Sequence, residues 1–394
     1  MPSTVILGTA RTPFGKMGGA LASQDATDLG GTAIAAALER SNVDPEQVQQ
    51  VAYGQVLQAG QGQIPSRQAQ IKADIPKEVP SETVNKVCAS GMRTIGLVDQ
   101  GIRVGDVEVA VAGGMESMSG APYLLPQARF GFRMGDAKAI DAMTHDGLTN
   151  PFSGRHMMEE ATEVAEELEL TRPDMDRWAA RSHQLAAKAT DEGRLADEIV
   201  GVTVKSKKEE TVVEADEAIR PDTSLEVLAK LPAMFKKDGT HTAGNAPGVN
   251  DGAGAVVLAS EEWAEREGRE PIARILAYGT VADDFPYLAR TPAKAAQQAL
   301  EKIGKSAEDV DLWEINEAFA SVALNSVRML GVDEDNVNVN GGAIALGHPI
   351  GASGARITGA LVHELRRRGG GLGVAAICSG GGQGDAIVLE VNGS

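Results

Sequence analysis

Cysteine is nearly absent from this chain of 394 residues, which contains only Cys88 and Cys378. Two cysteines exclude the disulfide framework of a small secreted domain and a zinc site with four cysteine ligands. Long apolar runs are also missing, since no stretch reaches the roughly 18 residues that a transmembrane helix needs. The first fifteen residues show no targeting signal. We therefore expect a cytoplasmic protein with two free thiols.

Positive charge is scarce, because 37 Lys and Arg face 55 Asp and Glu and leave a net charge of −18. Such a surface repels phosphate backbones and anionic lipid, so we expect neither nucleic acid nor membrane as a partner. Nucleotide-binding motifs are missing too, since neither a GxxxxGK[ST] loop nor a GxGxxG turn after a strand occurs. The length and a hydrophobic fraction of 42% predict a folded protein of two or three domains.

The sequence contains the same unit twice. Residues 37–56 (ALERSNVDPEQVQQVAYGQV) resemble residues 299–318 (ALEKIGKSAEDVDLWEINEA), at an offset of 262. Residues 88–96 (CASGMRTIG) resemble residues 351–359 (GASGARITG), at an offset of 263. Two matches at nearly the same offset predict a duplicated α/β unit, because solenoid repeats need three or more copies.

The duplication divides the chain into two halves and an insertion. We expect an N-terminal half at 1–118 and 250–267, a C-terminal half at 268–394, and a loop or cap domain at 119–249. The insertion has its own character, with an acidic amphipathic helix, a second helix that begins near a proline, and a scattered basic run. That basic run comprises Lys205, Lys207, Lys208, Arg220, Lys230, Lys236 and Lys237.

Hydrophobic periodicity predicts alternating helices and strands, and the uniformly apolar strands should be buried on both faces. This pattern is typical of α/β packing with covered sheets. The expected strands are 51–57, 107–112, 252–259, 374–377 and 386–391. The expected helices are 28–40, 89–102, 159–170 and 173–192.

Both cysteines lie at positions in the sequence that suit a catalytic thiol. Cys88 lies between a strand and a helix, where backbone N–H groups and the helix dipole should lower the pKa of its thiol. The small residues Ala, Ser and Gly that follow it leave room for another backbone or a substrate. Cys378 ends an apolar strand and enters Ser-Gly-Gly-Gly-Gln-Gly, whose N–H groups suit an oxyanion. The alternative is that Cys88 is an inert buried thiol and the glycine run is a tight loop.

Two further residues, His348 and Asn316, are candidates for catalytic roles because of their sequence surroundings. His348 lies in GGAIALGHPIG, held by a following proline and flanked by glycines. Asn316 lies where a strand meets a helix, and its amide could orient a water or donate to an oxyanion. The alternatives are a core imidazole and a helix N-cap. A cysteine beside a histidine forms a nucleophile–base pair, so the residues indicate thiol-based acyl transfer without metal or nucleotide.

Five blocks of the sequence resemble the signature blocks of the thiolase family. They are NKVCASGM (85–92), GGMESMS (113–119), NEAFA (316–320), GGAIALGHPIGASGAR (341–356) and CSGGGQG (378–384). The resemblance extends along essentially the whole chain. It implies a duplicated thiolase fold, in which two similar α/β halves form α-β-α-β-α layers and carry an inserted loop domain. Such enzymes are typically homodimers or homotetramers.

The resemblance also implies a role for each candidate. Cys88 would accept the acyl group, His348 would take its proton, and Cys378 would remove an α-proton from a second acyl-CoA. Asn316, through a water, and His348 would form one oxyanion hole, and the N–H groups of Cys88 and Gly380 would form the other. Coenzyme A would lie against the cap and act as a substrate rather than a cofactor. The residues matched to coenzyme A binding are Leu148, His156, Arg220, Ala243 and Gly248, with Ala318 and Phe319 near the acyl end.

The implied activity is acetyl-CoA C-acetyltransferase, favoured by the pair His156-Met157. Pro247 stands where that group commonly has serine, and residues 288–292 depart from its usual pattern. A degradative 3-ketoacyl-CoA thiolase of broader range is therefore the alternative. A non-catalytic lipid carrier of the same fold is a third possibility, which the complete set of Cys88, Asn316, His348 and Cys378 disfavours.

Overall fold

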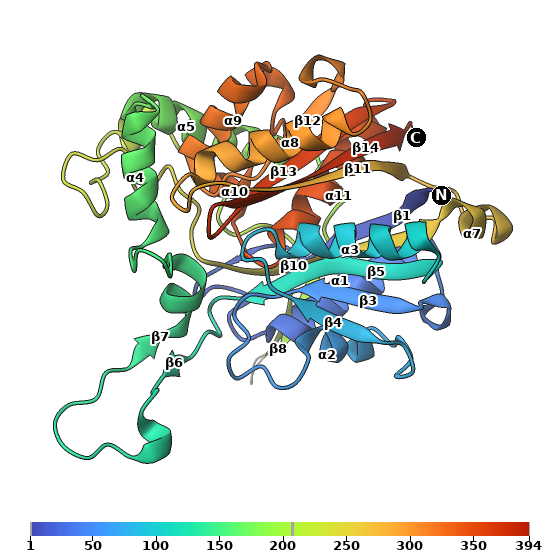
Figure 1. The fold of residues 1–394 in the computed structure, drawn as a ribbon, viewed down its shortest axis with the longest axis horizontal. Coiled ribbons are helices and arrows are strands. Elements are labelled where there is room, and N and C mark those ends of the chain that lie inside the picture. Colours follow the sequence, from blue (N-terminus) through green and yellow to red (C-terminus); the bar gives the residue numbers. More distant parts are fainter. Residues whose placement is uncertain (1, 206–208, 394) are drawn as a thin grey trace.

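The computed structural model describes residues 2–205 and 209–393. Its main sheet consists of two copies of one pattern (Figure 1). The N-terminal copy has the order β4-β3-β5-β10-β1, and the C-terminal copy has the order β12-β13-β14-β11. The strands are β1 (Thr4–Arg11), β3 (Gln50–Gly54), β4 (Ser81–Val84), β5 (Val109–Ser117), β10 (Asn250–Ser260), β11 (Ala273–Ala282), β12 (Leu312–Ile315), β13 (Gly370–Ser379) and β14 (Gln383–Asn392).

Strand directions repeat together with strand order. β3 runs parallel to β5, which is antiparallel to β10, which in turn is antiparallel to β1. β12, β13, β14 and β11 repeat these relations in the same sequence. The copies meet where Thr4–Ile6 of β1 pair antiparallel with residues 273–275 of β11. The predicted duplication is confirmed.

Helices form three layers around the two copies of the sheet (Figure 1). Helix α1 (Ala26–Ser41) and α2 (Pro65–Lys72) cover the outer face of the N-terminal copy. Helix α8 (Thr291–Glu301) and α9 (Ala320–Leu330) cover the outer face of the C-terminal copy. Between the copies, α3 (Ser90–Val104) and α11 (Ser353–Arg367) share one apolar core with strands of both. The predicted α-β-α-β-α order is therefore confirmed.

The repeated Ala-Ser-Gly motif marks the contact of the two central helices. Gly91 and Gly354 are equivalent in the repeat, and each lies in the first turn of its helix. A Cβ on Gly354 would lie 2.2 Å from the backbone nitrogen of Met92, and one on Gly91 would lie 2.8 Å from the carbonyl oxygen of Gly351. The slim first turn expected after Cys88 thus admits the backbone of the other half.

Replacing Gly354 by alanine is expected to lower the free energy of unfolding by about 3 kcal/mol, because backbone atoms cannot yield to the new methyl group. Chemical denaturation would measure the change. Gly101→Ala in α3 is the matched control, since its Cβ would meet nothing closer than 3.5 Å. Helix propensity predicts that this control is stabilised by up to about 1 kcal/mol. An equally stable Gly354→Ala protein would contradict the close helix contact.

The inserted segment packs beside the C-terminal copy and also extends away from it (Figure 1). Its helices are α4 (Met157–Glu167), α5 (Arg172–Asp191) and α6 (Leu225–Leu228), and α5 packs against α9 and α10 (Ala343–Leu346). Its short hairpins are β6 (Tyr123–Leu124) with β7 (Ile140–Asp141), and β8 (Val202–Lys205) with β9 (Glu210–Val213). The domain boundaries at 118/119 and 249/250 stay a prediction.

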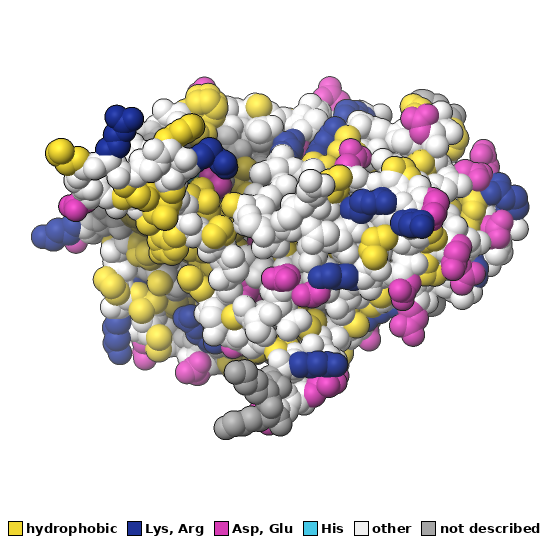
Figure 2. Space-filling model, turned by 90° about the horizontal axis from the view of Figure 1, so that it is seen from below, with side chains coloured by type: hydrophobic (Ala, Val, Ile, Leu, Met, Phe, Trp, Pro, Cys, Tyr) yellow, Lys and Arg dark blue, Asp and Glu magenta, His cyan; other side chains and the backbone are white. Residues whose placement is uncertain are grey.

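An arm formed by residues 120–141 carries exposed apolar side chains. Figure 2 shows apolar side chains gathered at this end of the molecule. Those of the arm are Tyr123, Leu125, Phe130, Phe132 and Met134. Within the described residues, no helix combines the length and the apolar character needed to cross a membrane.

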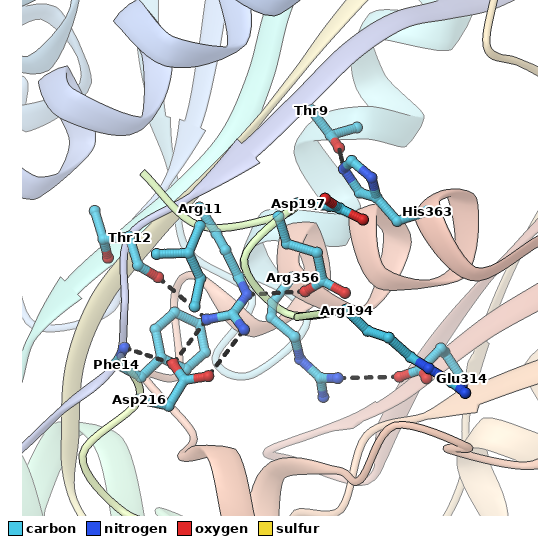
Figure 3. A network of polar contacts seen from close by, with 12 residues as sticks. Thr9, Arg11, Thr12, Phe14, Arg194, Asp197, Asp216, Glu314, Arg356 and His363 are labelled. Atoms are coloured by element: carbon cyan, nitrogen blue, oxygen red, sulfur yellow. Dashed lines mark hydrogen bonds and ion pairs between the residues drawn. The ribbon is translucent and has the colours of Figure 1, made fainter. Parts of the chain in front are cut away.

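A buried ion-pair network connects the inserted segment to the sheet (Figure 3). The guanidinium of Arg11, at the end of β1, lies 3.0 Å from Glu198 and 2.7 Å from Asp216 of the insertion. Nearby, Arg356 of α11 pairs with Glu314 of β12 at 3.0 Å. All five side chains are at most 4% exposed, so each charge depends on its partner.

Candidate active site

Cys88 lies on a sharp turn between β4 and α3. The residue before it, Val87, has φ = 43°, a left-handed conformation that is unfavourable for a β-branched residue. Such strain costs roughly 1–3 kcal/mol and persists only where the surroundings impose it. Here Ser90 imposes it, since its hydroxyl accepts from the N–H of Lys86 and donates to the carbonyl of Val87. The turn thereby fixes the direction of the Cys88 side chain.

The thiol of Cys88 is protonated at rest. Burial raises its pKa to about 12, although the N–H groups of Cys88 and Gly380 lower it by donating to the sulfur. The expectation of a lowered pKa at the helix start was therefore wrong, because loss of solvent outweighs two backbone dipoles. The side chain is only 3% exposed. An attack by this sulfur needs a base.

His348 has a defined tautomer. Its Nδ1 lies 2.6 Å from the hydroxyl of Ser353, and that hydroxyl donates its own proton to the carbonyl of Pro349 at 2.9 Å. Ser353 must therefore accept from Nδ1–H, which leaves Nε2 with a free lone pair. Nε2 has no hydrogen-bond partner within residues 2–205 and 209–393. The backbone N–H of His348 donates to Oδ1 of Asn250 at 2.9 Å, which fixes the residue from a second side.

The imidazole of His348 is neutral at physiological pH. Burial, assisted by the positive charge of Arg356, lowers its pKa to about 3. A neutral ring whose Nε2 has no partner among the described residues can act as a general base. It differs in this from a structural core histidine, whose two ring nitrogens are both hydrogen-bonded. The resting pair is thus a thiol and a neutral imidazole, and the proton moves as the sulfur attacks.

Cys378 is buried within electrostatic reach of the first thiol. It is 1% exposed, belongs to an apolar cluster that includes Met158, Ala318 and Phe319, and interacts electrostatically with Cys88. Burial raises the pKa of Cys378 well above its usual range, and the negative charge of a Cys88 thiolate would raise it further. The two sulfurs are 290 positions apart in the sequence (378 − 88 = 290), yet the duplicated fold brings them together.

Asn316 follows β12 and is fully buried. Helix α9 begins at Ala320 with Phe319 as its N-cap, so Asn316 is not the cap of that helix. In the part of the chain that the structure describes, neither its Oδ1 nor its Nδ2 has a hydrogen-bond partner. A buried amide of this kind is available to a water or a substrate oxygen.

One cavity of about 360 Å³ reaches Cys88 and His348. All seven residues matched to coenzyme A binding line it: Leu148, His156, Arg220, Ala243, Gly248, Ala318 and Phe319. Asn316 and Cys378 are not among its lining residues, and both are buried. The cavity brings Cys88 and His348 together with the residues matched to coenzyme A, and the individual roles stay predictions. Lys207 and Lys208 of the basic run lie outside the described residues.

The sequence interpretation missed part of the cavity wall and both anchors of the histidine. The wall residues that it did not name are mostly flexible or apolar: Met118, Met158, Met234, Phe235, Ala246, Val249 and Ile350. Met157 and Pro247, which it did name, also line the cavity. Phe235 stacks on His156 with ring centroids 4.5 Å apart. Four methionines spaced along 118–234 were the available signal, because methionine suits adaptable binding surfaces.

Comparisons with known proteins agree with this geometry. The model of the thiolase N-terminal domain matches residues 4–262, and that of the thiolase C-terminal domain matches residues 269–391. The acetyl-CoA acetyltransferase of Chromobacterium violaceum is 48% identical over 98% of both chains. That of Paracoccus denitrificans is 47% identical over 99% of this chain and 100% of its own.

Solved structures extend the likeness to three dimensions. The Bacillus anthracis acetyl-CoA acetyltransferase superimposes with a TM-score of 0.97 at 41% identity, and human mitochondrial 3-ketoacyl-CoA thiolase with 0.96 at 43%. Each comparison covers 99% of both chains. Matching domains, full-length relatives and a shared fold all lead to one conclusion: this chain belongs to the thiolase family.

Proposed function

We propose that this thiolase is an acetyl-CoA C-acetyltransferase, which reversibly condenses two acetyl-CoA to acetoacetyl-CoA and coenzyme A. The observation that carries the proposal is the single cavity in which the Cys88 thiol and the free Nε2 of His348 meet the expected coenzyme A residues. The names of the full-length relatives support acetyl as the acyl group. We expect no metal or further cofactor.

In the first half-reaction, Nε2 of His348 takes the proton of Cys88 as the sulfur attacks the thioester carbonyl. A carbon–sulfur bond to Cys88 forms, and the bond to the coenzyme A sulfur breaks. The leaving thiolate receives the proton from His348. The N–H groups of Cys88 and Gly380 would stabilise the developing oxyanion, and their donation to the Cys88 sulfur at rest supports this role.

In the second half-reaction, the neutral His348 takes the proton of the Cys378 thiol, and the resulting thiolate removes an α-proton from a second acetyl-CoA. The carbanion attacks the acetyl carbonyl on Cys88 and a carbon–carbon bond forms. The bond to the Cys88 sulfur breaks, and that sulfur receives the proton held by His348. His348 and Asn316, through a water, would hold the enolate oxygen, which fits their unpartnered polar atoms. The electrostatic effect of Cys88 on Cys378 supports the nearness of the two thiols that this step requires.

Incubation with acetyl-CoA is expected to leave an acetyl group on Cys88, detected by peptide mass spectrometry. Acetylation of Cys378 alone, or of neither cysteine, would contradict the proposal. A thiolysis series over 3-ketoacyl-CoA chain lengths separates the two activities of the family. We expect the highest kcat/KM with acetoacetyl-CoA, whereas a broad-range degradative thiolase would favour longer chains.

We also propose a cytoplasmic homodimer or homotetramer. The exposed apolar side chains of the arm at 120–141 support assembly, since a monomer rarely exposes so many neighbouring apolar groups.

A further inference from the structure

The segment that carries His348 is buried along its whole length. Every residue from 341 to 351 is shielded from solvent, so each backbone N–H needs an acceptor inside the protein. The N–H groups of Ile344 and Gly351, on either side of the histidine, both donate to glutamates from elsewhere in the chain. Those glutamates are Glu317 and Glu116, and neither has a place in the proposed reaction.

Glu317 is the acceptor for four donors. Its Oε1 accepts from Nε1 of Trp178 at 2.9 Å and from Nδ2 of Asn338 at 3.0 Å. Its Oε2 accepts from the hydroxyl of Ser182 at 2.8 Å and from the N–H of Ile344 at 3.0 Å. The carboxylate therefore ties α5 of the insertion to the histidine segment. It also fixes the backbone next to Asn316, its neighbour in the chain.

Glu116 holds the histidine segment by hydrogen bonds from the N-terminal half of the fold. It follows the glycines of β5 and accepts from the N–H groups of Val56 at 3.0 Å, Leu57 at 3.1 Å and Gly351 at 3.1 Å. The side chain is fully buried. Gly351 stands three residues after His348, and Ile344 stands four residues before it. The two carboxylates thus hold the segment on both sides of the catalytic ring.

A carboxylate is suited to this task because it accepts hydrogen bonds on both oxygens and donates none. Among the described residues, neither Glu116 nor Glu317 takes part in a close ion pair, and N–H and O–H donors surround each of them. Burial raises the pKa of Glu116 to about 7, and its three backbone N–H donors oppose that rise. The glycines of the segment leave room for both carboxylates. A Cβ on Gly342 would lie 2.2 Å from the carboxyl carbon of Glu317, and one on Gly351 would lie 2.9 Å from Glu116.

We infer that Glu116 and Glu317 are positioning residues that clamp the His348 segment between the two halves of the fold. The inference rests on the proposed function, in which Nε2 of His348 must face first the Cys88 proton and then an enolate oxygen. Displacement of about 1 Å can cost a catalytic step on the order of 100-fold. The clamp fixes the ring against such displacement, while Ser353 sets its tautomer.

The test compares Glu116→Gln and Glu317→Gln with Glu198→Gln. A glutamine has nearly the same shape, but its NH₂ would face N–H donors, so one side of each clamp is lost. Glu198 is the matched control, because it is equally buried but binds Arg11 away from the histidine segment. We expect kcat for acetoacetyl-CoA thiolysis to fall at least ten-fold in both clamp variants, with KM within three-fold. Glu198→Gln should keep kcat within two-fold despite a lower Tm.

Amide hydrogen exchange of residues 340–352 gives a readout that does not depend on activity. We expect faster exchange of Ile344 in Glu317→Gln and of Gly351 in Glu116→Gln, and no change in the control. Unchanged exchange, or kcat within two-fold of the parent protein, would overturn the inference. If a variant does not fold, Trp178→Phe removes one donor and leaves Glu317 in place, and a smaller loss of kcat is expected. If the parent protein showed no thiolysis activity, the proposed function would be refuted. Amide hydrogen exchange in the variants would still test whether Glu116 and Glu317 hold the histidine segment.

Discussion

Cys378→Ala protein is expected to take an acetyl group from acetyl-CoA onto Cys88 but to lose condensation activity by about 10²–10⁴-fold, the contribution of a positioned base. Acylation uses Cys88 and His348, which the substitution leaves in place. Condensation needs a proton to leave the α-carbon of the second acetyl-CoA, and the one thiol left in the variant, that of Cys88, carries the acetyl group at this stage. The effect should therefore separate the two half-reactions.

Mass spectrometry of the Cys88 peptide and a coupled assay of acetoacetyl-CoA formation would measure the two steps on one sample. Ser379→Ala is the neighbouring control, since its hydroxyl bonds the carbonyl of Lys86 and contributes no base. Loss of Cys88 acetylation in Cys378→Ala, or condensation at the parent rate, would refute the assigned division of labour.

Replacing His348 by alanine is expected to slow both half-reactions by about 10³–10⁴-fold. With a pKa of about 12, only about one Cys88 thiol in 10⁵ is ionised at pH 7 without a base. The acylation rate of the variant should then rise about ten-fold per pH unit between pH 7 and 10, because the thiolate fraction grows as pH rises toward that pKa. In the parent protein, His348 has a pKa of about 3 and is already neutral between pH 7 and 10. Titration of His348 should therefore not change the acylation rate of the parent protein over this range.

Single-turnover acetylation at several pH values would measure this slope. His363→Gln is the matched control, because His363 is half-buried, also has a lowered pKa, of about 4, and bonds Thr9 far along α11. We expect its acetylation rate to stay within two-fold of the parent. A flat profile in His348→Ala would show that another group takes the Cys88 proton.

The repeat and the chemistry-bearing residues could be predicted because both are local in the sequence. The Ala-Ser-Gly motifs that begin at residues 89 and 352 mark equivalent helix starts. The apolar composition of the strands on either side of these helices predicts that the strands are buried. The same holds for the strand-to-helix position of Cys88 and the glycine-flanked setting of His348. Hydrophobic period and turn chemistry act over a few residues, so a sequence displays them directly.

The state of the active site could not be predicted in this way. The sequence indicated a thiol with a lowered pKa, whereas burial by strands and helices from both halves raises it to about 12. The tautomer of His348 depends on a hydroxyl that itself has to donate to Pro349. Asn250, which holds the histidine backbone, is 98 residues away in the chain.

By itself the sequence determined the duplicated α/β plan, the family and the identity of the two thiols, the imidazole and the amide. Only the tertiary structure decided that the thiol is protonated, that Nε2 rather than Nδ1 is free, and that Glu116 and Glu317 hold the histidine segment. The physical reason is that folding elements follow local pattern, whereas a pKa, a tautomer and a hydrogen-bond partner depend on groups that meet only when distant parts of the chain are buried together.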